Sequence, residues 1–89
     1  MKKIFRTNRF KKDVKKMKKR DKSFGVFKEV IHKLAKDEQL EKRFRDYKLK
    51  GDYVGTRECH IEPDWLLIYE GGEDELILIR TGTHSDLFG

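Results

Sequence analysis

The chain of 89 residues has one cysteine and one proline, and it lacks any long apolar run. The single cysteine, Cys59, excludes an intramolecular disulfide and fits a reducing compartment, so we expect a cytoplasmic protein. No apolar run approaches the roughly 18 residues of a membrane-spanning helix, so we expect no transmembrane helix. The basic residues at the start are not followed by an apolar stretch, which argues against a signal peptide.

Apolar residues are also scarce. They make up 36% of the chain, against 43% for charged residues. Six phenylalanines, three tyrosines and one tryptophan partly compensate, because aromatic side chains bury a large apolar area. Domains mostly hold about 50–200 residues, so the length predicts one domain over 1–89 and leaves no room for a second.

Charge is distributed unevenly along the chain. Residues 1–50 hold 20 Lys and Arg against 7 Asp and Glu, whereas residues 51–89 hold 2 against 9. The net charge of +6 therefore combines a half of +13 with a half of −7. A basic half of this kind indicates an anionic partner, either nucleic acid or a membrane surface.

The first half predicts a short strand over 2–7 and two helices. The first helix has Asn8 as its expected N-cap and ends near Arg20. Its apolar stripe has helical spacing and consists of Phe10, Val14 and Met17. The second helix is expected from a cap at Ser23 to about Lys36. Its stripe consists of Phe27, Val30, Ile31 and Leu34.

The second half changes to strand periodicity after a segment, 37–52, that we expect to be mostly loop. Three runs of strand length follow: residues 56–61, 65–69 and 76–79. Gly71 and Gly72 indicate a hairpin turn, and the last two runs are apolar on both faces, as central strands are. Thr83 and Asp86 form a capping box for a short closing helical turn. The predicted fold is α+β, with two N-terminal helices packed on a twisted, mainly antiparallel sheet.

Four residues with acid–base or phosphate-binding chemistry lie near predicted strand ends: His60, Asp64, Arg80 and His84. Strand alternation places His60 on the open face of the sheet if Cys59 faces the helices. The set suits general acid–base catalysis on an anionic substrate. Plainer alternatives stay open: Arg80 pairs with an acid on a neighbouring strand, and Asp64 is a turn residue.

No metal site is expected. Cys59 and His60 point to opposite faces, and the sequence offers no second cysteine or paired histidine as further ligands. His32 lies beside the apolar stripe of the second helix, and we expect it at the surface or the boundary.

The first helix carries an exposed lysine face formed by Lys12, Lys15, Lys16 and Lys19. Eight basic residues lie between Lys11 and Lys22, more than solubility requires, so nucleic-acid contact is favoured over an ordinary solvated face. A membrane-surface helix would need a broader apolar face.

Two blocks, CHIEPDWLLIY at 59–69 and RTGTHSDLF at 80–88, resemble the YafQ branch of the RelE/ParE toxin superfamily. The resemblance implies the toxin of a type II toxin–antitoxin module, with two helices on a mainly antiparallel sheet. It implies a ribosome-dependent endoribonuclease that cuts mRNA in the ribosomal A site without a metal or other cofactor. The expected reaction is attack of a ribose 2′-hydroxyl on the adjacent phosphate.

The resemblance also implies roles for individual residues. His60 matches an active-site base or transition-state stabiliser, and Asp64 matches a residue of the same site. Arg80 matches the arginine that stabilises phosphate charge, and His84 matches the general acid for the leaving oxygen.

Three aromatic residues complete this comparison. Trp65 matches a residue that lines the site, and Phe88 matches an aromatic residue that supports the substrate. Tyr47 stands where family members often have a histidine. A free phenol titrates near 10 and is a poor base at neutral pH. Either His60 takes the base role, the phenol is activated by nearby cations, or the rate is reduced. Our hypothesis is that the toxin stays active and that Tyr47 positions the 2′-hydroxyl.

The implied partners are the ribosome, mRNA and a cognate antitoxin with an acidic segment, and operator DNA only through the toxin–antitoxin complex. Two alternatives stay open: a ParE-like toxin that inhibits DNA gyrase, and a non-catalytic RNA- or ribosome-binding module. The acid–base residues favour the nuclease, because a gyrase inhibitor has no need for them.

Overall fold

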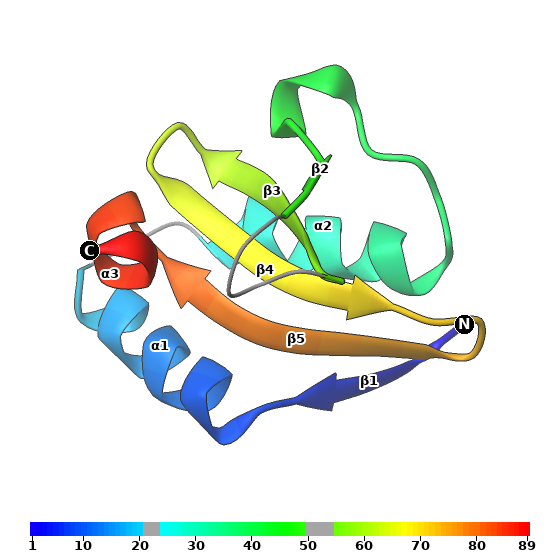
Figure 1. Ribbon diagram of the computed structural model, residues 1–89, viewed down its shortest axis with the longest axis horizontal. Helices are drawn as coiled ribbons and strands as arrows, with labels where there is room; N and C mark the ends of the chain where they lie inside the picture. Colours follow the sequence, from blue (N-terminus) through cyan, green and yellow to red (C-terminus); the bar gives the residue numbers. More distant parts are fainter. Residues whose placement is uncertain (21–23, 50–54) are drawn as a thin grey trace.

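The computed structural model describes residues 1–20, 24–49 and 55–89 (Figure 1). In chain order the elements are β1 (Lys3–Arg6), α1 (Asn8–Lys19), α2 (Phe24–Ala35), the 3-10 helix η1 (Lys42–Phe44), β2 (Tyr47–Lys48), β3 (Arg57–Glu62), β4 (Trp65–Gly71), β5 (Glu75–Gly82) and α3 (His84–Phe88). They form an α+β fold, as predicted. None of the helices in these ranges combines the length and the apolar character that a membrane span requires.

The strands form a mixed, mainly antiparallel sheet of order β1-β5-β4-β3-β2. β1 pairs with β5 in parallel, and the other neighbours are antiparallel. β4 and β5 are interior strands, which confirms the prediction from their two apolar faces.

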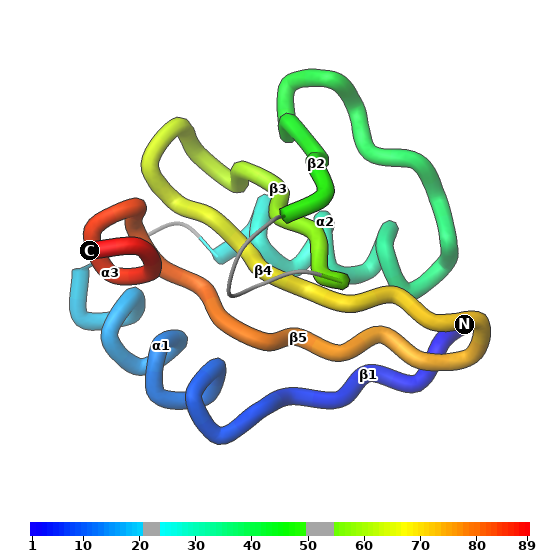
Figure 2. The backbone as a smooth tube through the Cα atoms, in the orientation of Figure 1, coloured from blue at the N-terminus to red at the C-terminus, as the bar shows by residue number. Residues whose placement is uncertain are grey.

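The two faces of the sheet are covered unequally. The main core lies on the helix side, where Trp65, Leu67 and Tyr69 of β4 pack with residues of α1 and α2. The open face carries a small second cluster, in which Leu66 and Ile68 pack against Leu87 of α3. Figure 2 shows α3 beside the end of α1, on the opposite side of the view from residue 1.

β4 and β5 extend beyond the expected runs 65–69 and 76–79, so that Gly71, expected in the turn, ends β4. Two further differences concern the first helix and the segment 37–52. Thr7 caps α1 by accepting a hydrogen bond from the Phe10 backbone N–H at 3.0 Å, so Asn8 is the first helical residue and not the cap. The segment 37–52 contains η1 and β2, because Tyr47 and Lys48 pair with β3, a distant partner that local pattern does not reveal. The expected cap Ser23 and residues 50–52 lie outside the described residues.

α1 completes the edge of β5 beyond the end of β1. β1 pairs with β5 only as far as Leu78. From there the Thr7 hydroxyl donates to the Ile79 carbonyl at 2.7 Å, and the Thr81 backbone N–H donates to Asp13 of α1 at 3.2 Å. An exposed strand edge is thereby avoided.

A β-bulge sets the direction of Arg80. Plain alternation from the buried residues Leu76 and Leu78 would turn Arg80 toward the helix side. The register with β4 shifts between Ile68 and Tyr69, however, so that Arg80 lies opposite Ile68. Opposite residues of an antiparallel pair share a face, so Arg80 lies on the open face with Ile68.

Trp65 is the centre of the helix-side core. Its side chain is fully buried and its ring stacks on Phe27, with centroids 4.9 Å apart. The indole N–H donates to the Thr81 hydroxyl at 2.8 Å, and that hydroxyl donates to the Leu66 carbonyl at 2.6 Å. Thr81 therefore satisfies two buried polar groups at once.

We expect Thr81→Val to lower the free energy of unfolding by about 1–3 kcal/mol, because it leaves the indole N–H of Trp65 without an acceptor. Urea unfolding measures this as a lower midpoint with an unchanged slope. Thr81→Ser keeps the hydroxyl and should cost less. Equal losses for the two variants would contradict a role for the hydroxyl.

Candidate active site

The centre of the site is a contact between Asp64 and His84. Asp64 lies in the turn between β3 and β4, and His84 is the first residue of α3. One carboxylate oxygen of Asp64 lies 2.7 Å from His84 Nδ1 and accepts the His84 backbone N–H at 3.0 Å. Both side chains are more than half exposed, at 65% and 54%, so the pair is open to a large ligand.

The contact also fixes the tautomer of His84. An ionised carboxylate only accepts hydrogen bonds, so Nδ1 carries the proton that Asp64 accepts. Nε2 is then the ring atom that can exchange a proton with a ligand. This is the arrangement of an oriented acid–base histidine.

α3 is held in place by Asp86. Thr83 and Asp86 form the predicted capping box. Asp86 also accepts hydrogen bonds from Arg20 of α1 at 2.6 and 3.1 Å and from Lys16 at 3.0 Å. The hydrogen bond from Arg20, followed by those from Thr83 and Lys16, holds the pKa of Asp86 well below its ordinary value despite partial burial. Glycine is favoured at position 82, because its φ of 158° is rarely adopted by other residues and an added Cβ would lie 3.0 Å from Asp86.

His60 lies next to this pair on the open face. Its ring centroid is 5.6 Å from that of His84. Cys59 packs in the helix-side core, so His60 faces the opposite side, as alternation predicts. His60 is only 9% exposed, and its Nδ1 is buried without a hydrogen-bond partner in the described part of the chain. Its Nε2 lies 3.7 Å from a carboxylate oxygen of Glu58.

Two exposed aromatic residues border the site. Tyr47 of β2 lies opposite Glu58 of β3, so both share the face of His60. The ring centroid of Phe88 is 6.4 Å from that of His84. Tyr47 and Phe88 are 56% and 48% exposed, large values for aromatic side chains of a small domain.

Arg80 is held by an acid from a helix. Its Nε and one terminal nitrogen each donate to a carboxylate oxygen of Asp13, both at 3.0 Å. The side chains of Arg80 and Asp13 are only 14% and 8% exposed. Sequence reasoning foresaw an ion pair for Arg80 as the plainer alternative, but with an acid on a neighbouring strand and not on α1. Asp13 fixes the plane of the guanidinium from one side.

Trp65 and the lysine face of α1 lie outside the group of side chains around Asp64 and His84. The Trp65 side chain is fully buried in the core on the helix side and has no exposed surface for a substrate, so it packs the core and does not line the site. The four lysines of the predicted lysine face are all exposed on α1: Lys12, Lys15, Lys16 and Lys19. Lys16 is engaged with Asp86. His32 is exposed on α2, as expected.

Sequence reasoning missed Asp13 and Glu58. Asp13 stands between Phe10 and Met17 of the apolar stripe, which was the available signal that a charged side chain enters the core. Glu58 stands two residues before His60 on the same strand face.

Cys59 cannot serve the site. It is fully buried on the helix side, and burial raises the pKa of its thiol well above the ordinary range. Within the ranges that the structure describes, no three His, Cys, Asp or Glu side chains lie together as a metal site would need.

Comparisons with known proteins agree over the whole chain. The model of a family described as bacterial toxin of type II toxin–antitoxin system, YafQ, matches residues 2–89. The mRNA interferase toxin YafQ of Escherichia coli K12 is 38% identical over 84 residues, which cover 93% of this chain and 91% of that protein.

Solved structures are also similar. A copper-bound mutant toxin from Helicobacter pylori has a TM-score of 0.94 at 44% identity, covering 99% of this chain and 100% of that one. YafQ from E. coli BL21(DE3) has a TM-score of 0.94 at 36% identity, covering both chains completely. YafQ in the E. coli DinJ–YafQ complex has a TM-score of 0.93 at 37% identity, again with both chains covered completely.

The Asp86 contacts predict how stability depends on pH. Because the pKa of Asp86 is lowered by folding, its charge contributes stability above the unfolded value near 4, and the contribution is lost as pH falls further. The stability advantage of the wild type over Asp86→Asn should therefore be constant at about pH 6–7 and shrink below about pH 4. Chemical unfolding across this range measures it.

Asp74→Asn is the matched control, because it removes the same charge from an exposed residue between β4 and β5. The role of Asp86 would be contradicted if the loss of unfolding free energy in Asp86→Asn did not depend on pH. It would also be contradicted if that loss were no larger than the loss in Asp74→Asn.

Proposed function

This chain belongs to the YafQ family of bacterial toxins of type II toxin–antitoxin systems, and we propose that it is an mRNA interferase, an endoribonuclease that stops translation. The observation that carries the proposal is the exposed Asp64–His84 pair, with the ring of His60 beside it. An oriented histidine on an open face suits proton transfer to a long polymeric substrate.

The proposed reaction needs only the residues of this site. The 2′-oxygen of a ribose forms a bond to the adjacent phosphorus, and the bond from phosphorus to the 5′-oxygen of the next nucleotide breaks. The 2′-hydroxyl proton leaves to a base, and the 5′-oxygen receives a proton from Nε2 of His84. The products are a 2′,3′-cyclic phosphate and a 5′-hydroxyl.

We assign the base to Nε2 of His60, which has Glu58 as its neighbour, and the positioning of the 2′-hydroxyl to Tyr47. The support is that Tyr47 lies opposite Glu58 and that Glu58 is the near neighbour of His60 Nε2. Phe88 supports the substrate beside His84.

Arg80 stabilises the charge that develops on the phosphate. Asp13 accepts hydrogen bonds from two nitrogens of the guanidinium and so fixes its orientation. Since Asp13 compensates the full charge, the contribution of Arg80 lies in directed hydrogen bonds and not in a net positive charge.

We further propose that the toxin acts on mRNA in the ribosome, with the exposed lysines of α1 on ribosomal RNA. The E. coli relative forms a complex with DinJ. By analogy we assign this chain a cognate antitoxin with an acidic segment that crosses the basic helices and the open face. Operator DNA is then bound only through that complex. An mRNA target and a single buried cysteine suit the cytoplasm.

Single-turnover cleavage of mRNA on programmed ribosomes tests the proposal. His84→Gln should slow cleavage about 10²–10⁴-fold, the usual effect of losing one proton-transfer group. His32→Gln changes a histidine exposed on α2 and should cleave at the wild-type rate. A wild-type rate for His84→Gln would show that His84 is not the acid.

Replacement of lysines on α1 tests the binding surface. Lys12, Lys15 and Lys19 should be changed to Gln together, and Lys16 should be kept because it holds Asp86. We expect weaker ribosome binding with a smaller salt slope, because each lost phosphate contact removes about 0.7–0.9 from the slope.

The same charge change elsewhere is the control for this experiment. It consists of the triple Gln variant at Lys28, Lys36 and Lys42, which are all exposed outside α1. Equal salt slopes for the two triple variants would show that the position of the lysines is incidental.

A further inference from the structure

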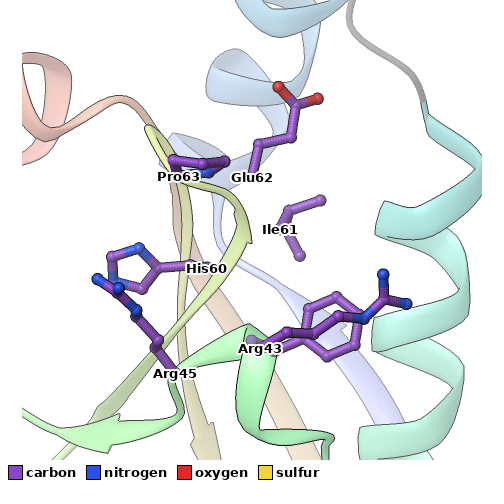
Figure 3. Close-up of a pocket in the computed structure, with 7 residues that line it drawn as sticks. Arg43, Arg45, His60, Ile61, Glu62 and Pro63 are labelled. Atoms are coloured by element: carbon purple, nitrogen blue, oxygen red, sulfur yellow. The ribbon is translucent and has the colours of Figure 1, made fainter.

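A pocket of about 350 Å³ adjoins the site at His60. Its other lining residues have no role in the proposed reaction. Its lining comes from the end of β3, the following turn and the segment around η1: Arg43, Phe44, Arg45, His60, Ile61, Glu62 and Pro63. Figure 3 shows Arg45 and His60 on one side of the pocket and Arg43 with Ile61 on the other. His60 is thus shared between this pocket and the Asp64–His84 pair.

The pocket combines an apolar wall with cationic groups. Phe44 and Ile61 are 3% and 7% exposed and form the floor of this wall, and the exposed Pro63 forms its accessible edge. Arg43 lies over the Phe44 ring at 4.5 Å from its centroid and pairs with Glu41 at 3.1 Å, so its charge is already compensated. The wall and the stacked guanidinium suit a flat aromatic group.

Arg45 provides the cation of this pocket. It is exposed, and its side chain has no acidic partner among the residues that the structure describes. Its backbone is left-handed, with φ 45° and ψ 64°, at the end of η1. Glycine or asparagine would adopt this conformation at lower cost, and such strain is typical of functional positions.

We propose that this pocket binds the nucleotide of the RNA substrate that flanks the cleaved bond. Its base lies against Pro63 and the Arg43 guanidinium above that floor, and Arg45 holds its phosphate. Because His60 lines the pocket and also lies beside His84, an RNA chain whose reactive phosphate lies at these two histidines places a neighbouring nucleotide at the pocket. The inference rests on the proposed function, because it names a subsite of that same reaction.

Cleavage kinetics on programmed ribosomes test the subsite. Arg45→Asn suits the left-handed backbone and should raise the half-saturating toxin concentration about tenfold or more, with the maximal rate nearly unchanged, through loss of a charge-assisted contact to phosphate. Lys42→Gln is the matched control, because Lys42 is an exposed cation of η1 outside the pocket lining. Equal effects of both variants would overturn the proposal.

The contact between the pocket and the nucleobase is tested with mRNA that carries an abasic site at either nucleotide flanking the cleaved bond. The wild type should cleave one of the two abasic messages about tenfold less efficiently, the scale of one lost stacking contact. Arg45→Asn should still discriminate against it, since the apolar wall is intact. Equal cleavage of both abasic messages and the intact message by the wild type would overturn the base contact.

Binding to the full-length protein separates failure of this inference from failure of the proposed function. NMR titration with nucleoside 5′- and 3′-monophosphates should shift the backbone amides of Arg45 and Ile61 in the wild type, and weaker shifts are expected in Arg45→Asn. These shifts would support the pocket even if no RNA were cleaved. The pocket proposal would be overturned if inorganic phosphate alone caused shifts as large as those caused by the nucleotides. It would also be overturned if only a poly-glutamate peptide caused shifts.

Discussion

The buried ion pair between Asp13 and Arg80 is the contact on which the rest of the structure depends. It joins α1 to β5 where β1 ends, and the same carboxylate also accepts the Thr81 backbone N–H. Burying two charges carries a desolvation cost, which bidentate geometry and additional hydrogen bonds offset. Removal of one partner would leave a buried charge unpaired, typically at a cost of about 3–5 kcal/mol.

The uneven charge of the sequence gains a physical meaning in this fold. Ion pairs cross between its two halves, since Arg20 and Lys16 neutralise Asp86 and Asp13 neutralises Arg80. α3 is thereby fixed beside α1, and His84 at its start is held against Asp64. The remaining lysines of α1 stay exposed and can attract an RNA backbone that the acidic strands would repel.

Much of this arrangement follows from local pattern, and the rest depends on contacts between distant segments. Strand alternation placed His60 on the open face, and the capping box at Thr83 predicted α3. Alternation alone fails for Arg80, because the bulge that turns it arises from the pairing of β4 with β5. The burial of Asp13 and of the Trp65 ring likewise depends on which elements pack together, which periodicity does not specify.

We propose that the Asp64–His84 site cuts RNA through the ribose 2′-hydroxyl. The most direct measurement is cleavage of programmed ribosomes that carry mRNA with one 2′-deoxynucleotide on the 5′ side of the cleaved bond, with end analysis by mass spectrometry. We expect no cut at that bond, and 2′,3′-cyclic phosphate and 5′-hydroxyl ends on the unmodified message. Efficient cleavage of the deoxy-substituted bond, or 5′-phosphate ends, would contradict this mechanism.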